Sequence, residues 1–197
     1  MENILLVGYG GHAKSIADCI ERQGIYKIAG YTDIIQQESD YEYLGTDEKL
    51  QEYYERGIKK AVIGIGYLGI GEIREKLYNK LKCIGYELPV ICDPSAIISS
   101  TAYIGEGTFI GKNAIINAEA YVGNACIINT KALVEHECKV KEFSHIAVAA
   151  VLCGQVQVGR AVLVGANATV IQCMDIPDRS IIPAGAVVRK GYFKRGK

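Results

Sequence analysis

The sequence has no excess of charge of either sign, because 22 lysine and arginine residues balance 22 aspartate and glutamate residues. Without a positive field there is no electrostatic basis for binding nucleic acid or an anionic membrane surface. Long apolar runs are also missing. The apolar run at residues 4–7 ends at Gly8, and no positively charged segment precedes it. We therefore expect no nucleic-acid partner, no signal peptide and no membrane-spanning helix.

Paired cysteines and clustered histidines are missing as well. The seven cysteines are an odd number and none shows C-x-x-C spacing, so we expect reduced thiols in a cytoplasmic protein. The three histidines, His12, His136 and His145, are too scattered to form a zinc site. The sequence therefore predicts neither disulfides nor a bound metal.

What the second half of the chain has in abundance is a six-residue repeat. An aliphatic residue recurs at sixteen consecutive sixth positions: Ile98, Ile104, Ile110, Ile116, Val122, Ile128, Val134, Val140, Ile146, Leu152, Val158, Val164, Val170, Ile176, Ile182 and Val188. A small or modest side chain stands two positions before each of them. A period of six fits neither a helix nor a free-standing strand, and unbroken repetition of a short unit is typical of a solenoid.

Each six-residue unit predicts one short strand and one corner, with the aliphatic and the small residue both pointing inward. Three units would complete a triangular coil, and neighbouring coils would pair at about 4.8 Å. Glycines that follow the aliphatic position are predicted to supply backbone freedom where the chain bends; they are Gly105, Gly111, Gly123, Gly159 and Gly165. A β-sandwich with accidental spacing is the alternative, and sixteen consecutive matches weigh against it.

The first ninety residues follow different periods. Strand patterns over residues 3–7, 27–31, 60–63 and 87–91 alternate with helical patterns after residue 12, over 47–56 and over 73–84. This alternation predicts a small parallel α/β sheet, half of a doubly wound fold. The period changes near Pro94. We therefore predict an α/β domain over residues 1–92 and a solenoid domain over residues 93–197, docked closely because no long linker separates them.

A glycine-rich turn follows the first predicted strand. Gly8, Gly10 and Gly11 would let backbone N–H groups approach a phosphate at the start of a helix. Asp33, at the end of the second strand, could accept hydrogen bonds from a ribose or a base, and Gly64 emerges at the same edge of the sheet. These residues predict a nucleotide site.

Three interpretations of this turn compete. A nicotinamide dinucleotide is disfavoured because Ala13 stands where the fingerprint prefers glycine and because ninety residues give too small a sheet. A purely structural turn remains open, and a nucleotide sugar is favoured. His12 could contact the phosphate or sugar of that ligand, or it could only cap the helix.

A second set of residues lies in the solenoid, where His136 stands between Glu135 and Glu137. A histidine can take a proton near neutral pH, and an adjacent carboxylate, here Glu137, can raise its basicity or fix its tautomer. The alternative is an ordinary solvated edge. His145 follows nine residues later, half of an eighteen-residue coil, so the two histidines could converge only between protomers. That spacing predicts a closed cyclic oligomer, most simply a trimer.

The repeats resemble those of the hexapeptide-repeat acyltransferases, which form trimers of a left-handed parallel β-helix. The G-Y-G-G-H-A-K motif at residues 8–14, the solenoid, and the Asn129-Thr130 and V-E-H-E-C (134–138) segments are similar to one branch of that family. The branch contains bacterial sialic-acid O-acetyltransferases and nucleotide-linked amino-sugar N-acetyltransferases. The resemblance covers nearly the whole chain and implies an α/β, Rossmann-like N-terminal half-domain followed by a left-handed parallel β-helix.

The resemblance also implies roles for individual residues. His136 would be the general base, and Glu137 would increase its basicity. Acetyl-CoA would be contacted by His145, Asn129, Ala166 and Ala184. The nucleotide sugar would be bound by Gly10, Gly11, His12, Asp33 and Gly64.

The implied reaction is metal-free transfer of an acetyl group from acetyl-CoA to the amine of a UDP-4-amino-sugar type of substrate, for surface glycan synthesis. Sites would lie at the subunit interfaces of a homotrimer, and a backbone N–H or His145 would meet the oxyanion. One alternative is O-acetylation of a sugar hydroxyl such as that of sialic acid, and another is a non-catalytic solenoid that binds a ligand.

The sequence departs from the family's pattern at two places. Residues 190–195 replace the usual Gly-x-Pro-Ala-Lys ending, so the resemblance does not carry over to how the adenine end of CoA is held. The second glycine loop has extra residues at 67–70, which predicts a differently shaped sugar pocket.

Overall fold

The computed structural model describes residues 1–194. Its first part is an α/β unit of β1 (Glu2–Val7), α1 (Gly11–Gln23), β2 (Tyr26–Thr32), the short helix η1 (Asp47–Lys49), α2 (Leu50–Glu55), β3 (Lys60–Ile63) and α3 (Ile73–Ile84). The three strands are parallel, in the order β2-β1-β3. No helix among the described residues has both the length and the apolar character needed to cross a bilayer.

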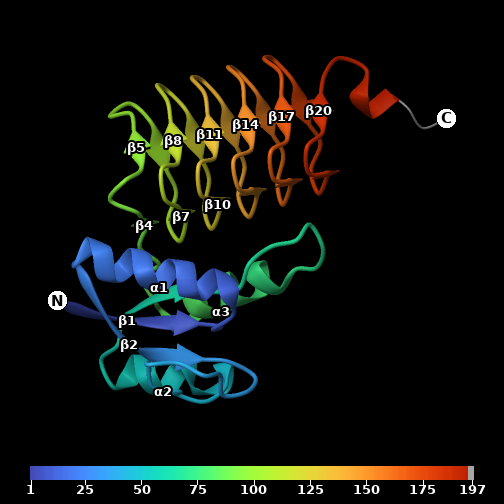
Figure 1. The fold of residues 1–197 in the computed structure, drawn as a ribbon. Helices are drawn as coiled ribbons and strands as arrows, with labels where there is room; N and C mark the ends of the chain where they lie inside the picture. The colour runs from blue at the N-terminus through green and yellow to red at the C-terminus, as the bar shows by residue number, and fades with distance from the viewer. Residues whose placement is uncertain (195–197) are drawn as a thin grey trace.

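Side chains along β1 point alternately to the two faces of the sheet, and apolar residues cover both faces. Ile4 and Leu6 pack with Ile16 of α1, whereas Leu5 packs on the other face with Leu77 of α3. Figure 1 shows the consequence: α1 lies between this sheet and the solenoid, and α2 lies on the far side of the sheet.

The predicted fourth strand over residues 87–91 is wrong. Glu87 makes a single parallel bridge with Lys60, and its carbonyl accepts a hydrogen bond from the Ala61 N–H at 3.0 Å. Pro89 follows two residues later and has no N–H to extend the ladder. Ile91 already begins β4 (Ile91–Cys92), which pairs with a solenoid strand instead.

The solenoid consists of two-residue strands in three parallel sheets, with eighteen residues between neighbouring strands of one sheet. Sheet B contains β4, β7 (Phe109–Ile110), β10 (Ile127–Ile128), β13 (His145–Ile146), β16 (Leu163–Val164) and β19 (Ile181–Ile182). Sheet C contains β5 (Ile97–Ile98), β8 (Ile115–Ile116), β11 (Leu133–Val134), β14 (Val151–Leu152), β17 (Thr169–Val170) and β20 (Val187–Val188). Sheet D contains β6 (Tyr103–Ile104), β9 (Tyr121–Val122), β12 (Lys139–Val140), β15 (Gln157–Val158) and β18 (Asp175–Ile176), and the short helix η2 (Tyr192–Lys194) follows β20.

The interior of the coils is built as the repeat predicts. The aliphatic and the small positions belong to one buried cluster, in which Ala132 and Val134 of one coil and Ala150 and Leu152 of the next are fully buried. The inward side chains of each coil are covered by those of the coils on either side, so the burial of one unit depends on stacking with the next.

The glycines that follow the aliphatic positions have another role than the one predicted. They do not adopt the left-handed conformation; twelve non-glycine residues do, one at each corner from Asn113 to Arg179, with φ between 51° and 62°. An added Cβ at Gly111 would lie 2.8 Å from the backbone nitrogen of Thr130 in the next coil. The five predicted glycines are therefore required by the close approach of successive coils and not by bending.

The α/β unit docks on sheet B. The outward residues Phe109 and Ile127 of that sheet are buried in the same cluster as Ile16 and Ile20 of α1. Figure 1 shows the strands of sheet C on the side of the solenoid that faces away from the α/β unit. Sheet C therefore lies between two edges: the BC edge, made by the connections from sheet B to sheet C, and the CD edge, made by the connections from sheet C to sheet D.

Candidate active site

A pocket of about 510 Å³ opens at the carboxyl ends of β1 and β3. The residues predicted to bind a nucleotide sugar all line it: Gly10, Gly11, His12, Asp33 and Gly64. The fold therefore brings these five residues together, as the position of the strand ends predicts.

The glycine turn is shaped by contacts that only glycine permits. Gly8 has φ +88°, and a Cβ at Gly64 would clash with the carbonyl oxygen of Gly8. An added Cβ at Gly10 or Gly11 would meet nothing within 4 Å. Helix α1 starts at Gly11 without a side-chain cap. Its first N–H groups are thus placed at an open surface where an anion would be stabilised.

Two carboxylates lie in this pocket, and sequence analysis found only one of them. Asp33 accepts hydrogen bonds from the backbone N–H groups of Tyr9 (2.8 Å) and Ile34 (2.7 Å), so it fixes the glycine turn against the end of β2. Asp47 also lines the pocket and accepts a hydrogen bond from the Thr32 hydroxyl at 2.7 Å. Asp47 was missed because its only sequence signal is that of a helix start.

His12 projects from α1 toward the solenoid, where its ring meets the edge of Phe109 at a centroid distance of 5.2 Å. Its Nε2 is buried, and no atom of residues 1–194 pairs with it. Burial, with help from the positive charge of Arg74, lowers the pKa of His12 to about 3. The side chain is therefore a neutral imidazole, and its Nε2 is a buried polar atom without a partner among the described residues.

His145 lies on the outer side of sheet B, beneath the second glycine loop. Its Nδ1 lies 2.7 Å from the carbonyl oxygen of Tyr67, and its Nε2 lies 3.1 Å from the side-chain amide nitrogen of Asn129. A carbonyl can only accept, so Nδ1 carries the proton and Nε2 accepts from the amide. Burial is the largest cause of a lowered pKa for His145.

These contacts correct one expectation for His145. With both ring nitrogens engaged, it has no free N–H to offer to an oxyanion. The loop is also fixed on the solenoid, because the Tyr67 hydroxyl donates to the carbonyl oxygen of Ala161 at 2.7 Å. Tyr67 is thus a second residue of this region that sequence analysis did not assign.

His136 lies on the CD edge, in the connection from β11 to β12, with 55% of its side chain exposed. Its Nδ1 lies 3.0 Å from Oε2 of Glu137, and the amide of Gln155 in the next coil donates to the same oxygen at 3.1 Å. The hydrogen bond with His136, followed by that from Gln155, holds the pKa of Glu137 below its usual range. The predicted pair is therefore formed, with Nε2 of His136 left available for a proton.

Three of the four predicted acetyl-CoA residues, Asn129, Ala166 and Ala184, lie along the other edge of sheet C, whereas His145 begins β13 of sheet B. Asn129 stands in the connection from β10 to β11, and the carbonyl of Ala166 accepts a hydrogen bond from Gly185 N–H, next to Ala184. Sheet C separates this BC edge from His136 within one protomer. One chain therefore does not bring the predicted base and the predicted acetyl-CoA positions together.

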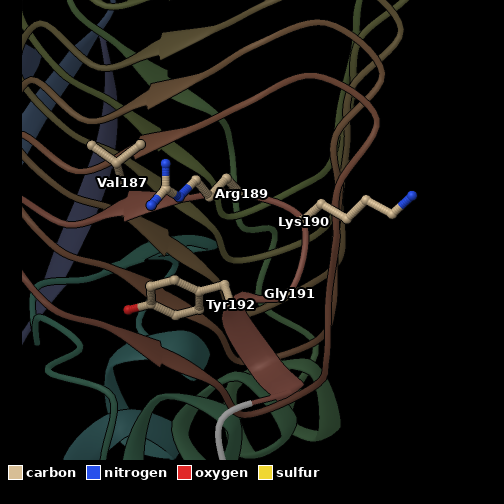
Figure 2. A pocket seen from close by; sticks show the side chains of 5 residues that line it. All are labelled: Val187, Arg189, Lys190, Gly191 and Tyr192. Carbon is tan, nitrogen blue, oxygen red and sulfur yellow. The ribbon is translucent and has the colours of Figure 1, made fainter.

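The end of the CD edge carries positive charge. Lys190 lies in the column of His136, three coils further along, and it lines a pocket of about 470 Å³ with Val187, Arg189, Gly191 and Tyr192. Figure 2 shows the side chains of Arg189 and Tyr192 on the same side of this pocket, with Lys190 pointing away from them. Arg189 and Lys190 thus give this edge a basic terminus, whereas Arg195 of the segment that departs from the family's usual ending lies outside the described residues.

Comparison of sequences relates both parts of the chain to known proteins. Residues 3–81 match the family described as PglD N-terminal domain. UDP-N-acetylbacillosamine N-acetyltransferase of Bacillus subtilis (strain 168) is 34% identical over 120 residues, which are 56% of this chain and 51% of that protein. The match therefore spans about half the length of this curated relative.

Two solved structures are similar over nearly the whole chain. Perosamine N-acetyltransferase of Caulobacter crescentus, a mutant in complex with CoA and GDP-perosamine, is 30% identical with a TM-score of 0.91, covering 96% of this chain and 89% of that one. The acetyltransferase domain of PglB from Neisseria gonorrhoeae, in complex with acetyl coenzyme A, is 26% identical with a TM-score of 0.87, covering 96% and 94%. This agreement confirms the predicted fold class, an α/β half-domain followed by a left-handed parallel β-helix.

Proposed function

Because this chain belongs to the hexapeptide-repeat acetyltransferases, in the branch of the sialic-acid O-acetyltransferases and the nucleotide-linked amino-sugar N-acetyltransferases, we propose that it acetylates the amine of a nucleotide-linked amino sugar. The donor is acetyl-CoA, and the acceptor is of the UDP-4-amino-sugar type used in surface glycan synthesis. The observation that carries this proposal is the pair of His136 and Glu137 on an exposed edge, with Nδ1 and Oε2 3.0 Å apart.

The chemistry follows from the state of His136. With Nδ1–H donated to Glu137, Nε2 is unprotonated. It accepts a proton from the sugar amine while the amine nitrogen attacks the thioester carbonyl. The new C–N bond forms, the C–S bond breaks, and the proton passes from Nε2 to the departing CoA sulfur. Because both ring nitrogens of His145 already have hydrogen-bond partners, we assign the stabilisation of the oxyanion to a backbone N–H.

A homotrimer would complete the site. Five of the six outward residues of sheet C are aliphatic: Ile97, Ile115, Leu133, Val151, Thr169 and Val187 occupy these positions. The corresponding residues of sheet D are mostly polar or amphipathic: Tyr103, Tyr121, Lys139, Gln157 and Asp175. The two ends of the sheet C column are exposed, Ile97 by 65% and Val187 by 58%. An aliphatic column of this length favours contact with another protein surface.

Three copies that turn sheet C toward a common axis would join the CD edge of each to the BC edge of the next. His136 of one protomer would then face Asn129, Ala166 and Ala184 of its neighbour. Acetyl-CoA would lie between the two edges, close to the nucleotide pocket of that neighbour. Binding both substrates in such a groove would supply much of the catalysis through proximity. We assign this reaction to the cytoplasm, which suits the seven free thiols.

The pocket at the start of α1 favours a nucleotide-linked acceptor over free sialic acid. An uncapped helix N-terminus beside Gly10 and Gly11 suits a phosphate, and sialic acid has none. The proposal is tested by release of CoA thiol from acetyl-CoA with a UDP-4-amino sugar, a GDP-amino sugar and sialic acid as acceptors.

We expect thiol release with one nucleotide amino sugar and an amide product by mass spectrometry. His136→Ala should lower kcat by about 10²-fold to 10⁴-fold, while Lys139→Ala on sheet D serves as the control. Turnover with sialic acid alone would indicate O-acetylation instead. No turnover by a folded trimer, or an unchanged rate for His136→Ala, would contradict the proposal.

A further inference from the structure

Glu137 and Gln155 occupy equivalent corners of neighbouring coils. Both are left-handed, with φ of 58° and 62°, and the N–H of Gln155 donates to the carbonyl oxygen of His136 at 3.0 Å. The register of the coils therefore places the side chain of Gln155 beside that of Glu137. The distance from Gln155 Nε2 to Glu137 Oε2 is 3.1 Å, on the oxygen that also contacts His136.

We propose that Gln155 is a positioning residue of the acetyl-transfer site, holding the Glu137 carboxylate against Nδ1 of His136. This inference rests on the proposed function, because it assigns a role in the orientation of the proposed base. Gln155 touches neither the imidazole's reactive Nε2 nor a substrate in this role, and it acts through Glu137.

The need for such a residue follows from the exposure of the pair. The side chains of His136 and Glu137 are 55% and 47% exposed. Long polar side chains on a surface keep several rotamers, and exposed ion pairs hold each other only weakly. A second donor on the same carboxylate reduces the conformations in which Glu137 leaves His136. Because the amide of Gln155 is neutral, it does so without cancelling the negative charge that supports an imidazolium.

The orientation of the amide is itself fixed by the next coil. The thiol of Cys173, the corner residue one coil beyond Gln155, lies 3.3 Å from Oε1 of Gln155. A thiol donates and a carboxylate only accepts, so the amide oxygen faces Cys173 and the amide N–H faces Glu137. In agreement, the hydrogen bond from Gln155 is the second cause, after that with His136, of the lowered pKa of Glu137.

The test compares Gln155→Met, which keeps the size and removes the donor, with Gln51→Met as a matched control. Gln51 makes the same kind of contact on the surface of α2, where its Nε2 donates to Oε1 of Glu55 at 2.8 Å. We expect kcat of Gln155→Met to fall on the order of tenfold, with the KM of acetyl-CoA and acceptor within about twofold. Gln51→Met should match the wild type.

A double-mutant cycle separates positioning from a general structural effect. If Gln155 acts only through Glu137, then Gln155→Met should cause no further loss of kcat in a Glu137→Gln background. Additive losses in the double variant would overturn the proposal. So would wild-type kcat in Gln155→Met.

The tautomer of His136 can be measured without turnover, so this test of Gln155 does not depend on the proposed reaction. The chain has three histidines, so ¹⁵N-histidine NMR resolves the tautomer of His136, with His136→Asn used for assignment. We expect the Nδ1–H tautomer to dominate in the wild type and to lose population in Gln155→Met but not in Gln51→Met. If the wild type transfers no acetyl group but this shift occurs, the positioning role stands and the proposed function fails. An unchanged tautomer ratio would overturn the positioning role whether or not acetyl transfer is observed.

Discussion

The imidazole of His136 lies over the backbone of Gly154 in the next coil. A Cβ at Gly154 would lie 2.6 Å from both Cε1 and Nε2 of the ring. Gly154 is not in the left-handed conformation, so its backbone does not require glycine. The space that the missing side chain leaves is filled by the ring of the proposed base.

Gly154→Ala should therefore separate stability from activity. The backbone accepts alanine, and a glycine-to-alanine change at a compatible site stabilises a protein by about 0.4–1 kcal/mol. The added methyl group must push the imidazole away from its position beside Glu137, so kcat should fall by about tenfold or more. Thermal unfolding and steady-state kinetics measure the two effects. An unchanged kcat would show that the position of the ring over Gly154 does not matter for the reaction.

Leu133→Glu should disrupt the proposed trimer. Leu133 lies near the middle of the aliphatic column on sheet C, and a buried carboxylate without a partner is costly. Sedimentation should change from about three times the 21.4 kDa chain mass to a single chain mass. Lys139→Glu on sheet D is the control and should remain trimeric. A wild-type protein that sediments as a monomer would refute the trimer.

Stability should depend on pH through His12. Its pKa is about 3 in the folded protein and 6.5 for the free side chain. Between these values the unfolded chain binds the proton and the folded chain does not, so stability is greatest above pH 6.5 and falls as the pH is lowered. The slope for one such group is about 1.4 kcal/mol per pH unit. Urea unfolding at several pH values should show a shallower loss for His12→Gln than for the wild type; equal slopes would contradict the neutral, buried state of His12.

Arg74→Met should loosen the contact between the two parts of the fold. The guanidinium is buried and donates hydrogen bonds to the carbonyl oxygens of Ile65 and, at 3.0 Å, Ala125 of the solenoid. Burial lowers the pKa of Arg74 to about 10, so it remains charged at neutral pH. Methionine leaves these carbonyls unpaired, which should cost about 2–4 kcal/mol. The Tm should fall by several degrees, whereas Arg56→Met, which removes an exposed ion pair with Glu52 at the C-terminal end of α2, should change it little.

Part of the candidate site was accessible from sequence because it lies within short stretches of chain. Gly10, Gly11 and His12 are consecutive, so a single turn brings them together. His136 and Glu137 are neighbours in the chain, so a single corner of the solenoid carries both. The period of the coil also held a signal that was not used. Adding eighteen residues to positions 136 and 137 gives Gly154, which lies against the imidazole, and Gln155, which donates to the Glu137 carboxylate.

The sequence by itself determined the solenoid and its core, because a six-residue period specifies the burial of each residue from its own position in the repeat, as for Ala132 and Val134. Only the tertiary structure decided the contacts made between the two units. Tyr67 meets His145 across 78 residues, and Arg74 meets Ala125 across 51. Such pairs carry no periodic signal, since they depend on how one folded surface fits another. For the same reason residues 87–91 do not form a strand of the α/β sheet. Pro89 ends the pairing that Glu87 begins, and Ile91 pairs with Phe109 of sheet B instead.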